Sequence, residues 1–106
     1  MNYRYMRILL FFDLPVNTPA DRHEYNVFHR YLLKNGFLML QESVYCKLAF
    51  NSSVVQSIVA NLYKNKPSEG LIQILTITEK QYSRMEFILG DKTTDVIDTD
   101  ERLLFL

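Results

Sequence analysis

The sequence predicts a single α+β domain whose strands and helices follow in the order β-α-β-β-α-β, and three observations predict this. A chain of 106 residues fits one domain. Hydrophobic residues make up 48% of it, which is enough to build a core and excludes extensive disorder. Apolar runs rich in β-formers alternate with segments in which apolar residues recur at helical spacing.

The first predicted strand covers Met6–Asp13, MRILLFFD, a continuous apolar run closed by an acidic residue. Such a run is typical of a central strand that is buried on both faces. Pro15 suits the loop that follows. The first predicted helix then begins at Thr18, a good cap, with Pro19 at the first helical position. Its expected buried face consists of Tyr25, Phe28, Tyr31 and Leu32, and Asn35-Gly36 supplies a left-handed stop.

Phe37–Phe50 is rich in β-formers and has a polar break at residues 41–43. This pattern predicts two strands in a hairpin, or one long bent strand. A second helix follows, because residues 51–53 offer caps and Gln56 lies three positions after Ser53, the spacing of a capping box. The apolar positions of this helix are Val55, Ile58, Val59 and Leu62.

The remaining segments are Leu71–Thr78, a fourth strand, a polar connector at 79–84, and Met85–Leu89, a possible fifth strand. Residues 91–101 are acidic and indicate an exposed linker before a short apolar end. We therefore expect a domain at 1–90 and an acidic linker with a C-terminal docking strand at 91–106.

This order predicts the ferredoxin-like arrangement, an antiparallel sheet with both helices on one face. The other face needs cover, and two copies packed sheet to sheet would provide it, so we expect a symmetric homodimer. The extra strand could pair with the partner's sheet edge. The chain's apolar end is a candidate for strand addition to a partner, with docking on its own dimer as the alternative: Arg102, Leu103, Leu104, Phe105 and Leu106.

The cysteine content and the short apolar run near the N-terminus indicate in which cellular compartment the protein works. Cys46 is the only cysteine, so the chain cannot form an internal disulfide, which favours a reducing environment. The apolar run at 8–12 is too short for a signal peptide or a membrane span. The expectation is a cytoplasmic protein with no membrane partner.

Charge is balanced overall but unevenly distributed. Residues 1–90 hold ten Lys and Arg against seven Asp and Glu, whereas residues 91–106 hold two against five. In a dimer the basic body is doubled, which could leave a positive face for nucleic acid, although the same small excess of basic residues is also ordinary for a domain of this size. Arg22, Arg30 and Lys34 share one predicted helix and could follow a phosphate backbone, although a solvated helix face explains them as well.

Asp13 is the most unusual residue for its context, since it follows five apolar residues at the end of a buried strand. A two-fold axis nearby would bring two Asp13 carboxylates together, and the pair could share a divalent cation that activates water against a phosphodiester. The alternative is that Asp13 organises the turn through hydrogen bonds to backbone N–H groups.

Other candidate groups are weaker. Ser43 and Tyr45 lie near the strand bend and could contact phosphate, but polar residues at a bend are more often structural. His23 and His29 lie six apart, which is not a metal spacing, so we expect both to be solvated. Cys46 has no Cys or His at ligand spacing, which argues against zinc. Three glycines, each at an element end, cannot form a phosphate-binding loop.

Four segments together resemble the CRISPR-associated protein two family: MRILLFFDLP, KNGF, LQESVYCKL and ILTITEKQYSRMEFILGDK. The ERLLFL ending and the overall length are most similar to members from type II systems, whose effector is a single large nuclease. The resemblance covers nearly the whole chain. It implies a ferredoxin-like homodimer that bridges two dimers of a larger integrase subunit. That assembly would hold a short DNA duplex and insert it into a repeat array.

The resemblance also implies residue roles. The family is described as a magnesium-dependent phosphodiesterase whose metal ligand ends the first strand, a position held here by Asp13. Arg22 and Lys92 match basic positions that face the duplex. Two alternatives to a DNA-binding scaffold stay open: a free-standing metal-dependent endoribonuclease similar to toxin nucleases, and a small-molecule regulatory domain on the same fold.

Overall fold

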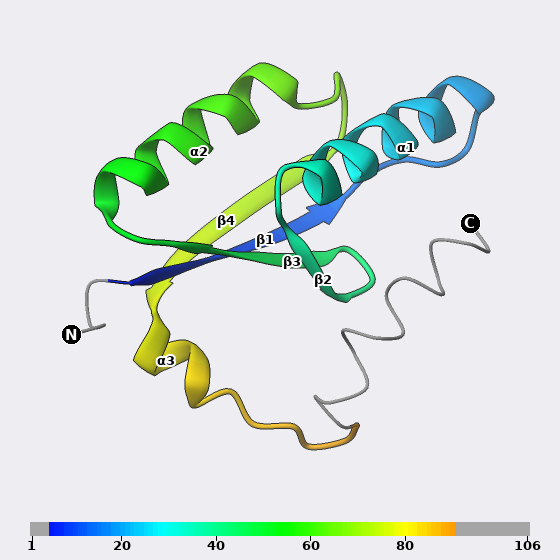
Figure 1. Cartoon of the computed structure of the whole chain (residues 1–106). Coiled ribbons are helices and arrows are strands. Elements are labelled where there is room, and N and C mark those ends of the chain that lie inside the picture. Colours follow the sequence, from blue (N-terminus) through cyan, green and yellow to red (C-terminus); the bar gives the residue numbers. More distant parts are fainter. Residues whose placement is uncertain (1–4, 91–106) are drawn as a thin grey trace.

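The computed structural model describes residues 5–90 (Figure 1). Seven elements follow one another along this part of the chain: β1 (Met6–Asp13), α1 (Pro19–Lys34), β2 (Leu38–Gln41), β3 (Val44–Ala49), α2 (Ser52–Asn65), β4 (Leu71–Thr78) and α3 (Glu79–Ser83). The predicted β-α-β-β-α-β order is confirmed.

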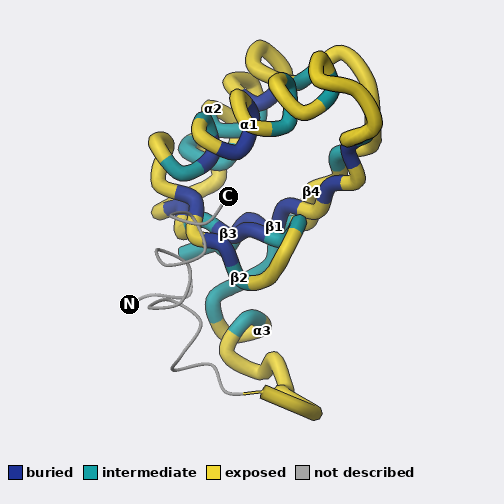
Figure 2. Tube along the Cα trace, turned by 90° about the vertical axis from the view of Figure 1, so that its right-hand side faces the viewer, coloured by how far each residue is buried: buried dark blue, intermediate teal, exposed yellow. Residues whose placement is uncertain are grey.

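The four strands form one antiparallel sheet in the order β2-β3-β1-β4. Helices α1 and α2 cover one face, and the short helix α3 lies on the opposite side (Figures 1 and 2). The two-layer arrangement with both long helices on one face is the one that the sequence predicts. We call the face away from α1 and α2 the open face.

Strand β1 occupies the centre of the sheet, as its apolar sequence predicts. It pairs with β3 from Met6↔Ala49 to Phe11↔Val44, and with β4 from Met6↔Thr78 to Asp13↔Leu71. Alternate side chains of a strand point to opposite faces. Ile8, Leu10 and Phe12 are buried toward the helices. The other set points to the open face: Arg7, Leu9, Phe11 and Asp13.

The core lies between the sheet and the two long helices, where Figure 2 shows the buried parts of the trace. The Phe12 ring is central to it. Its centroid lies 5.6 Å from that of Tyr25, 5.9 Å from that of Phe28 and 5.6 Å from that of Tyr45. These ring contacts join β1, α1 and β3, so the predicted apolar stripe of α1 does form the packing face.

Side-chain caps define where the helices begin. At α1, the Thr18 hydroxyl accepts from the Asp21 N–H at 3.0 Å, and the Asp21 carboxylate accepts from the Thr18 N–H at 3.2 Å. At α2, the Asn51 amide oxygen accepts from the Val54 N–H at 2.9 Å. The capping box expected from Ser53 and Gln56 is therefore wrong, because the helix begins two residues earlier.

Two tight turns shape the β2–β3 region. Gly36 has φ of +86° after α1, as the predicted left-handed stop requires. Ser43 has φ of +65° in the turn between β2 and β3, which confirms the hairpin rather than one bent strand. The register shifts between Met39 and Gln41, and this irregularity bends the short edge strand.

The structure corrects the expectation for residues 79–89. The predicted polar connector is helix α3, capped by Thr78, whose hydroxyl accepts from the Gln81 N–H at 3.0 Å. The predicted strand Met85–Leu89 does not form. A strand needs a hydrogen-bonded neighbour, and α3 carries the chain off the sheet before residue 85. The expected docking strand at the chain end lies outside the described residues.

Helix α3 is fastened to the open face by Arg7. The guanidinium forms a two-point pair with Glu79, from Nε to Oε2 at 3.1 Å and from Nη2 to Oε1 at 2.5 Å. It also lies 4.3 Å from the centre of the Tyr82 ring. The ion pair and the cation–π contact together hold α3 against the start of β1.

Candidate functional site

Asp13 ends β1 at the edge where the sheet opens to solvent. Its backbone pairs with Leu71 of β4, while the ladder with β3 has already ended. The Asp13 side chain is exposed, and within residues 5–90 its carboxylate neither pairs with a cation nor accepts a hydrogen bond. It does not organise the turn through backbone N–H groups there, which was the alternative to a metal role. Carboxylate oxygens of this kind suit Mg²⁺ as a donor type.

The ligand set that one copy provides around Asp13 is small. Among the described residues, no group of three or more His, Cys, Asp or Glu side chains lies close enough together to hold a metal ion. A divalent cation at Asp13 would therefore need the second copy's carboxylate and water or phosphate oxygens. The donor chemistry fits Mg²⁺, and the count of ligands fits only in a dimer.

The loop after Asp13 is held by the first turns of α1. Arg22 donates from Nη1 to the carbonyl oxygens of Val16 at 3.1 Å and Asn17 at 3.4 Å. Arg22 is exposed, but part of its guanidinium is committed to this loop rather than free for phosphate. The loop that follows Asp13 makes no hydrogen bonds within the sheet. The hydrogen bonds from Arg22 therefore hold its backbone in place.

The other predicted nucleic-acid residues are spread out. Arg30 and Lys34 are exposed on the side of α1 that turns away from the sheet, where a phosphate backbone could reach them. They do not converge with Asp13, which lies at the opposite end of α1 on another face of the molecule. Lys92 and the predicted docking residues Arg102–Leu106 lie outside the described residues.

Tyr45 and His29 form a buried pair that corrects two expectations. The Tyr45 hydroxyl lies 2.5 Å from His29 Nδ1, and both side chains are buried, so Tyr45 does not face phosphate and His29 is not solvated. His29 Nε2 is buried without a hydrogen-bond partner among residues 5–90. Burial lowers the pKa of His29 and raises that of Tyr45. Ser43 occupies the hairpin turn with positive φ, and its backbone carbonyl accepts from the Phe12 N–H of β1 at 3.0 Å.

Cys46 is buried beneath α3 on the open side of the sheet. Its Sγ lies 3.7 Å from Arg7 Nη1 and 3.9 Å from the Tyr82 hydroxyl. Burial and the neighbouring Cys46 raise the pKa of Tyr82 to about 12. The contacts support a packing role for this thiol, and within the described part of the chain it has no companion ligands for zinc.

The open face carries exposed apolar side chains from all four strands. Cross-strand partners share a face, so Leu38, Leu48 and Leu75 join Phe11 and Leu71 on this side. Their exposed fractions run from 36% for Phe11 to 54% for Leu71 and Leu75. Met85, Phe87, Ile88 and Leu89, just beyond α3, are also exposed. Grouped apolar surface of this kind marks an interaction site rather than a catalytic one.

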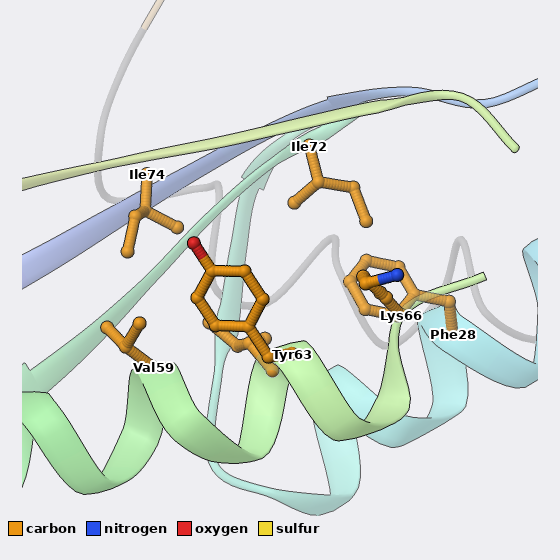
Figure 3. Close-up of a pocket in the computed structure, with 7 residues that line it drawn as sticks. Phe28, Val59, Tyr63, Lys66, Ile72 and Ile74 are labelled. Carbon is orange, nitrogen blue, oxygen red and sulfur yellow. The ribbon is translucent and has the colours of Figure 1, made fainter. Parts of the chain in front are cut away.

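A small pocket of about 130 Å³ lies between α2 and β4 (Figure 3). Aliphatic and aromatic side chains line most of it, with Lys66 at one end: Phe28, Val59, Leu62, Tyr63, Lys66, Ile72 and Ile74. It lies on the helix side of the sheet, whereas the Asp13 side chain lies on the open face. An apolar hollow without converging polar groups gives no reason to assign catalysis to it.

Two residues that shape the surroundings of Asp13 could not be found from the sequence. Gly70 ends the loop before β4 and lies against the Asp13–Leu14 backbone, and Glu24 holds the same loop through Ser68. Glu24 and Ser68 are 44 residues apart, so no local pattern links them. The glycine at the loop end was the available signal, and by itself it indicates no more than a turn.

Known proteins similar to this chain place it in one family. Residues 6–85 match the family described as CRISPR associated protein Cas2. The chain belongs to the Cas2 family. A relative from Treponema denticola, named CRISPR-associated endoribonuclease Cas2, is 55% identical over 101 residues, covering 95% of this chain and all of the relative. Proteins of the same name from Streptococcus mutans (44% identical, 95% and 93% covered) and Ligilactobacillus salivarius (40%, 95% and 100%) are also similar.

Family membership confirms the resemblance that the sequence motifs indicated, and relatives from Treponema and Streptococcus are consistent with members from type II systems. The name endoribonuclease belongs to those relatives. Within residues 5–90 no helix is both long enough and apolar enough to cross a membrane.

Proposed function

We propose that this Cas2 protein is a homodimeric, DNA-binding scaffold subunit of the CRISPR complex that acquires new spacers. The observation that carries the proposal is the open face, an exposed apolar sheet surface opposite the two long helices. Packed sheet to sheet, two copies would cover this face and leave each α1 on the outside. The dimer would then present Arg30 and Lys34 twice, once on each flank.

The scaffold role is supported by the cations on the outer surface of α1 and by the few metal-binding groups that one chain brings together. The outer cations are separated and suit contact with phosphates along a duplex, which binds without reading bases. Within residues 5–90, a single chain gathers no group of three or more His, Cys, Asp or Glu side chains that could hold a metal ion. A larger integrase subunit would supply the chemistry of insertion, and the chain end at Arg102–Leu106 would dock on it by strand addition.

The dimer is tested by comparing Leu75→Glu with the matched control Val27→Glu in the full chain. Both sites are half-exposed aliphatic positions, at 54% and 45%, but only Leu75 lies on the open face. We expect the native protein and the control to sediment at twice the 12.6 kDa chain mass and Leu75→Glu to sediment as a monomer. A native monomer, or a dimer that tolerates Leu75→Glu, contradicts the proposed packing.

Duplex binding is tested with the pair Arg30→Ala and Lys34→Ala against Lys64→Ala, an exposed lysine on α2. Affinity should fall for the α1 variants, and the slope of log affinity against log salt should shrink by about 0.9 for each phosphate that the variant no longer neutralises. An unchanged slope removes α1 from the interface.

Deleting residues 102–106 should weaken association with the integrase subunit, and unchanged association rejects strand addition.

A second candidate activity rests on a specific observation, the Asp13 carboxylate on the open face, which is exposed and has no cation beside it within residues 5–90. We propose that the two Asp13 side chains of a dimer share Mg²⁺ for phosphodiester cleavage, in line with the endoribonuclease name of the relatives. Asp13→Asn keeps the size of the side chain and removes its charge. Cleavage that persists in this variant rejects the metal site, and integration that survives while cleavage stops supports the scaffold role.

A further inference from the structure

We propose that Gly70 is a positioning residue for Asp13, and that Glu24 holds it in that role through Ser68. The inference rests on the proposed metal site, because it concerns how the Asp13 carboxylate is placed. The loop that leads into β4 would then support the metal site indirectly, because it fixes the backbone of Asp13, the proposed metal ligand.

The first observation is steric. A Cβ atom on Gly70 would lie 2.9 Å from the Asp13 carbonyl oxygen, 3.3 Å from Leu14 Cα and 2.5 Å from Leu14 Cδ2. Two of these neighbours are backbone atoms, which cannot rotate away as a long side chain can. Gly70 also has φ of +113°, a conformation that other residues adopt only with strain. Any side chain here must therefore push the Asp13–Leu14 peptide or the loop out of place.

The second observation is the brace on the loop itself. One carboxylate oxygen of Glu24 accepts from the Ser68 N–H at 2.9 Å and from the Ser68 hydroxyl at 3.0 Å, and the hydroxyl lies 2.9 Å from the other oxygen. These hydrogen bonds lower the pKa of Glu24, so the carboxylate is ionised when it holds the loop. The bonds join α1 to the loop that ends at Gly70.

The two observations meet at Asp13. Its neighbour along the sheet is Leu71, the residue directly after Gly70, so the loop and the ligand share the last rung of the β1–β4 ladder. On the other side, Arg22 holds the loop that follows Leu14. Helix α1 thus fixes the Asp13 backbone from both directions, through Arg22 on one loop and Glu24 on the other. A ligand shared across a two-fold axis needs this precision, because any shift is repeated in both copies.

The test compares Gly70→Ala with Gly36→Ala in the full-length protein. Gly36 is a matched control, since it also has positive φ and its added Cβ would meet only the flexible end of Lys47, at 2.7 Å. Both substitutions impose backbone strain, but only Gly70→Ala disturbs Asp13. Two readouts are taken: Mn²⁺ affinity by electron paramagnetic resonance, and the amide NMR shifts of Asp13 and Leu14 without metal.

We expect Gly70→Ala to weaken Mn²⁺ binding by about tenfold, the scale on which removal of a supporting group weakens a metal site, and to shift both amides. Gly36→Ala should leave both readouts as in the native protein. The proposal is overturned if Gly70→Ala changes neither readout, if it moves the amides without weakening Mn²⁺ binding that depends on Asp13, or if Gly36→Ala produces the same changes.

Two further variants keep the test decisive. Should Gly70→Ala not fold, Glu24→Ala removes the brace without adding strain, and the same loss of Mn²⁺ affinity and the same shifts are expected in the same direction. Asp13→Asn separates the two proposals. Mn²⁺ binding that is unaffected by Asp13→Asn rejects the metal site itself, and the amide shifts alone then decide whether Gly70 positions Asp13.

Discussion

The buried histidine of α1 gives the protein a pH-dependent stability that can be worked out from its surroundings. His29 is 5% exposed, its Nδ1 contacts the Tyr45 hydroxyl, and its Nε2 has no hydrogen-bond partner within residues 5–90. Burial, and next the positive charge of Arg30, lower its pKa below the ordinary 6.5. Protonation would place a charge and an unpaired N–H donor among aromatic rings, because Tyr25 stacks on one side and Tyr45 meets it edge-on.

The direction in which stability changes with pH follows from the proton affinities of the folded and unfolded chain. The folded chain binds this proton less well than the unfolded chain, so the contribution of neutral His29 is complete above pH 6.5. It is lost as the pH falls from 6.5 toward the lowered pKa of the folded state. One proton gives a slope of at most about 1.4 kcal/mol per pH unit over this window. In a domain of this size, about 1 kcal/mol corresponds to roughly 4–8 °C in Tm.

The assay is urea denaturation of the native protein and of His29→Gln at pH 7.5, 6.5 and 5.5. Gln is neutral throughout, so the variant should lose the slope between pH 6.5 and 5.5 even if it is less stable at every pH. His23→Gln is the control, since His23 is exposed on the same helix. Equal slopes for the native protein and His29→Gln would refute the reasoning.

Three further perturbations test the contacts that shape the domain. Glu79→Gln should lower the free energy of unfolding by about 1 kcal/mol in low salt and by less in 1 M NaCl, since it removes the charge that pairs with Arg7; a salt-independent loss contradicts this. Thr18→Ala should cost about 1 kcal/mol by removing the cap of α1, measured by thermal unfolding. Tyr45→Phe should cost about 1–3 kcal/mol, because it leaves His29 Nδ1 buried without its partner; denaturation that matches the native protein would show that the contact contributes nothing.

The elements that could be predicted from the sequence are those whose cause is local. The run of apolar residues in β1, the cap at Thr18 and the stop at Gly36 all act within a few positions, and each appears as predicted. The order of these elements then leaves few possible sheets. Asp13 could be singled out because a charge after a buried strand marks the point where that strand reaches solvent.

The misses have physical causes. His29 lies at the i+4 position from Tyr25 and three before Leu32, so helical spacing alone would have assigned it to the buried face, but a polar side chain was expected in water. The capping residues Thr78 and Gln81 directly follow a strand and lie in a short polar segment, a pattern that also indicates a connector. The strand predicted at 85–89, which could pair with a partner's sheet edge, does not form in the described chain, where α3 leads the backbone away from the sheet. Gly70 and Glu24 act across long sequence separations.

The central place of β1 has a consequence for synthesis of the chain. Its two neighbours in the sheet are encoded later, one ending at Ala49 and the other at Thr78. While the ribosome is still producing the second half, MRILLFFD has one or both of its edges and its apolar side chains uncovered. The amides that bond to β4 become protected from solvent exchange only when this last strand pairs, so slow translation between residues 50 and 78 should favour aggregation through this segment.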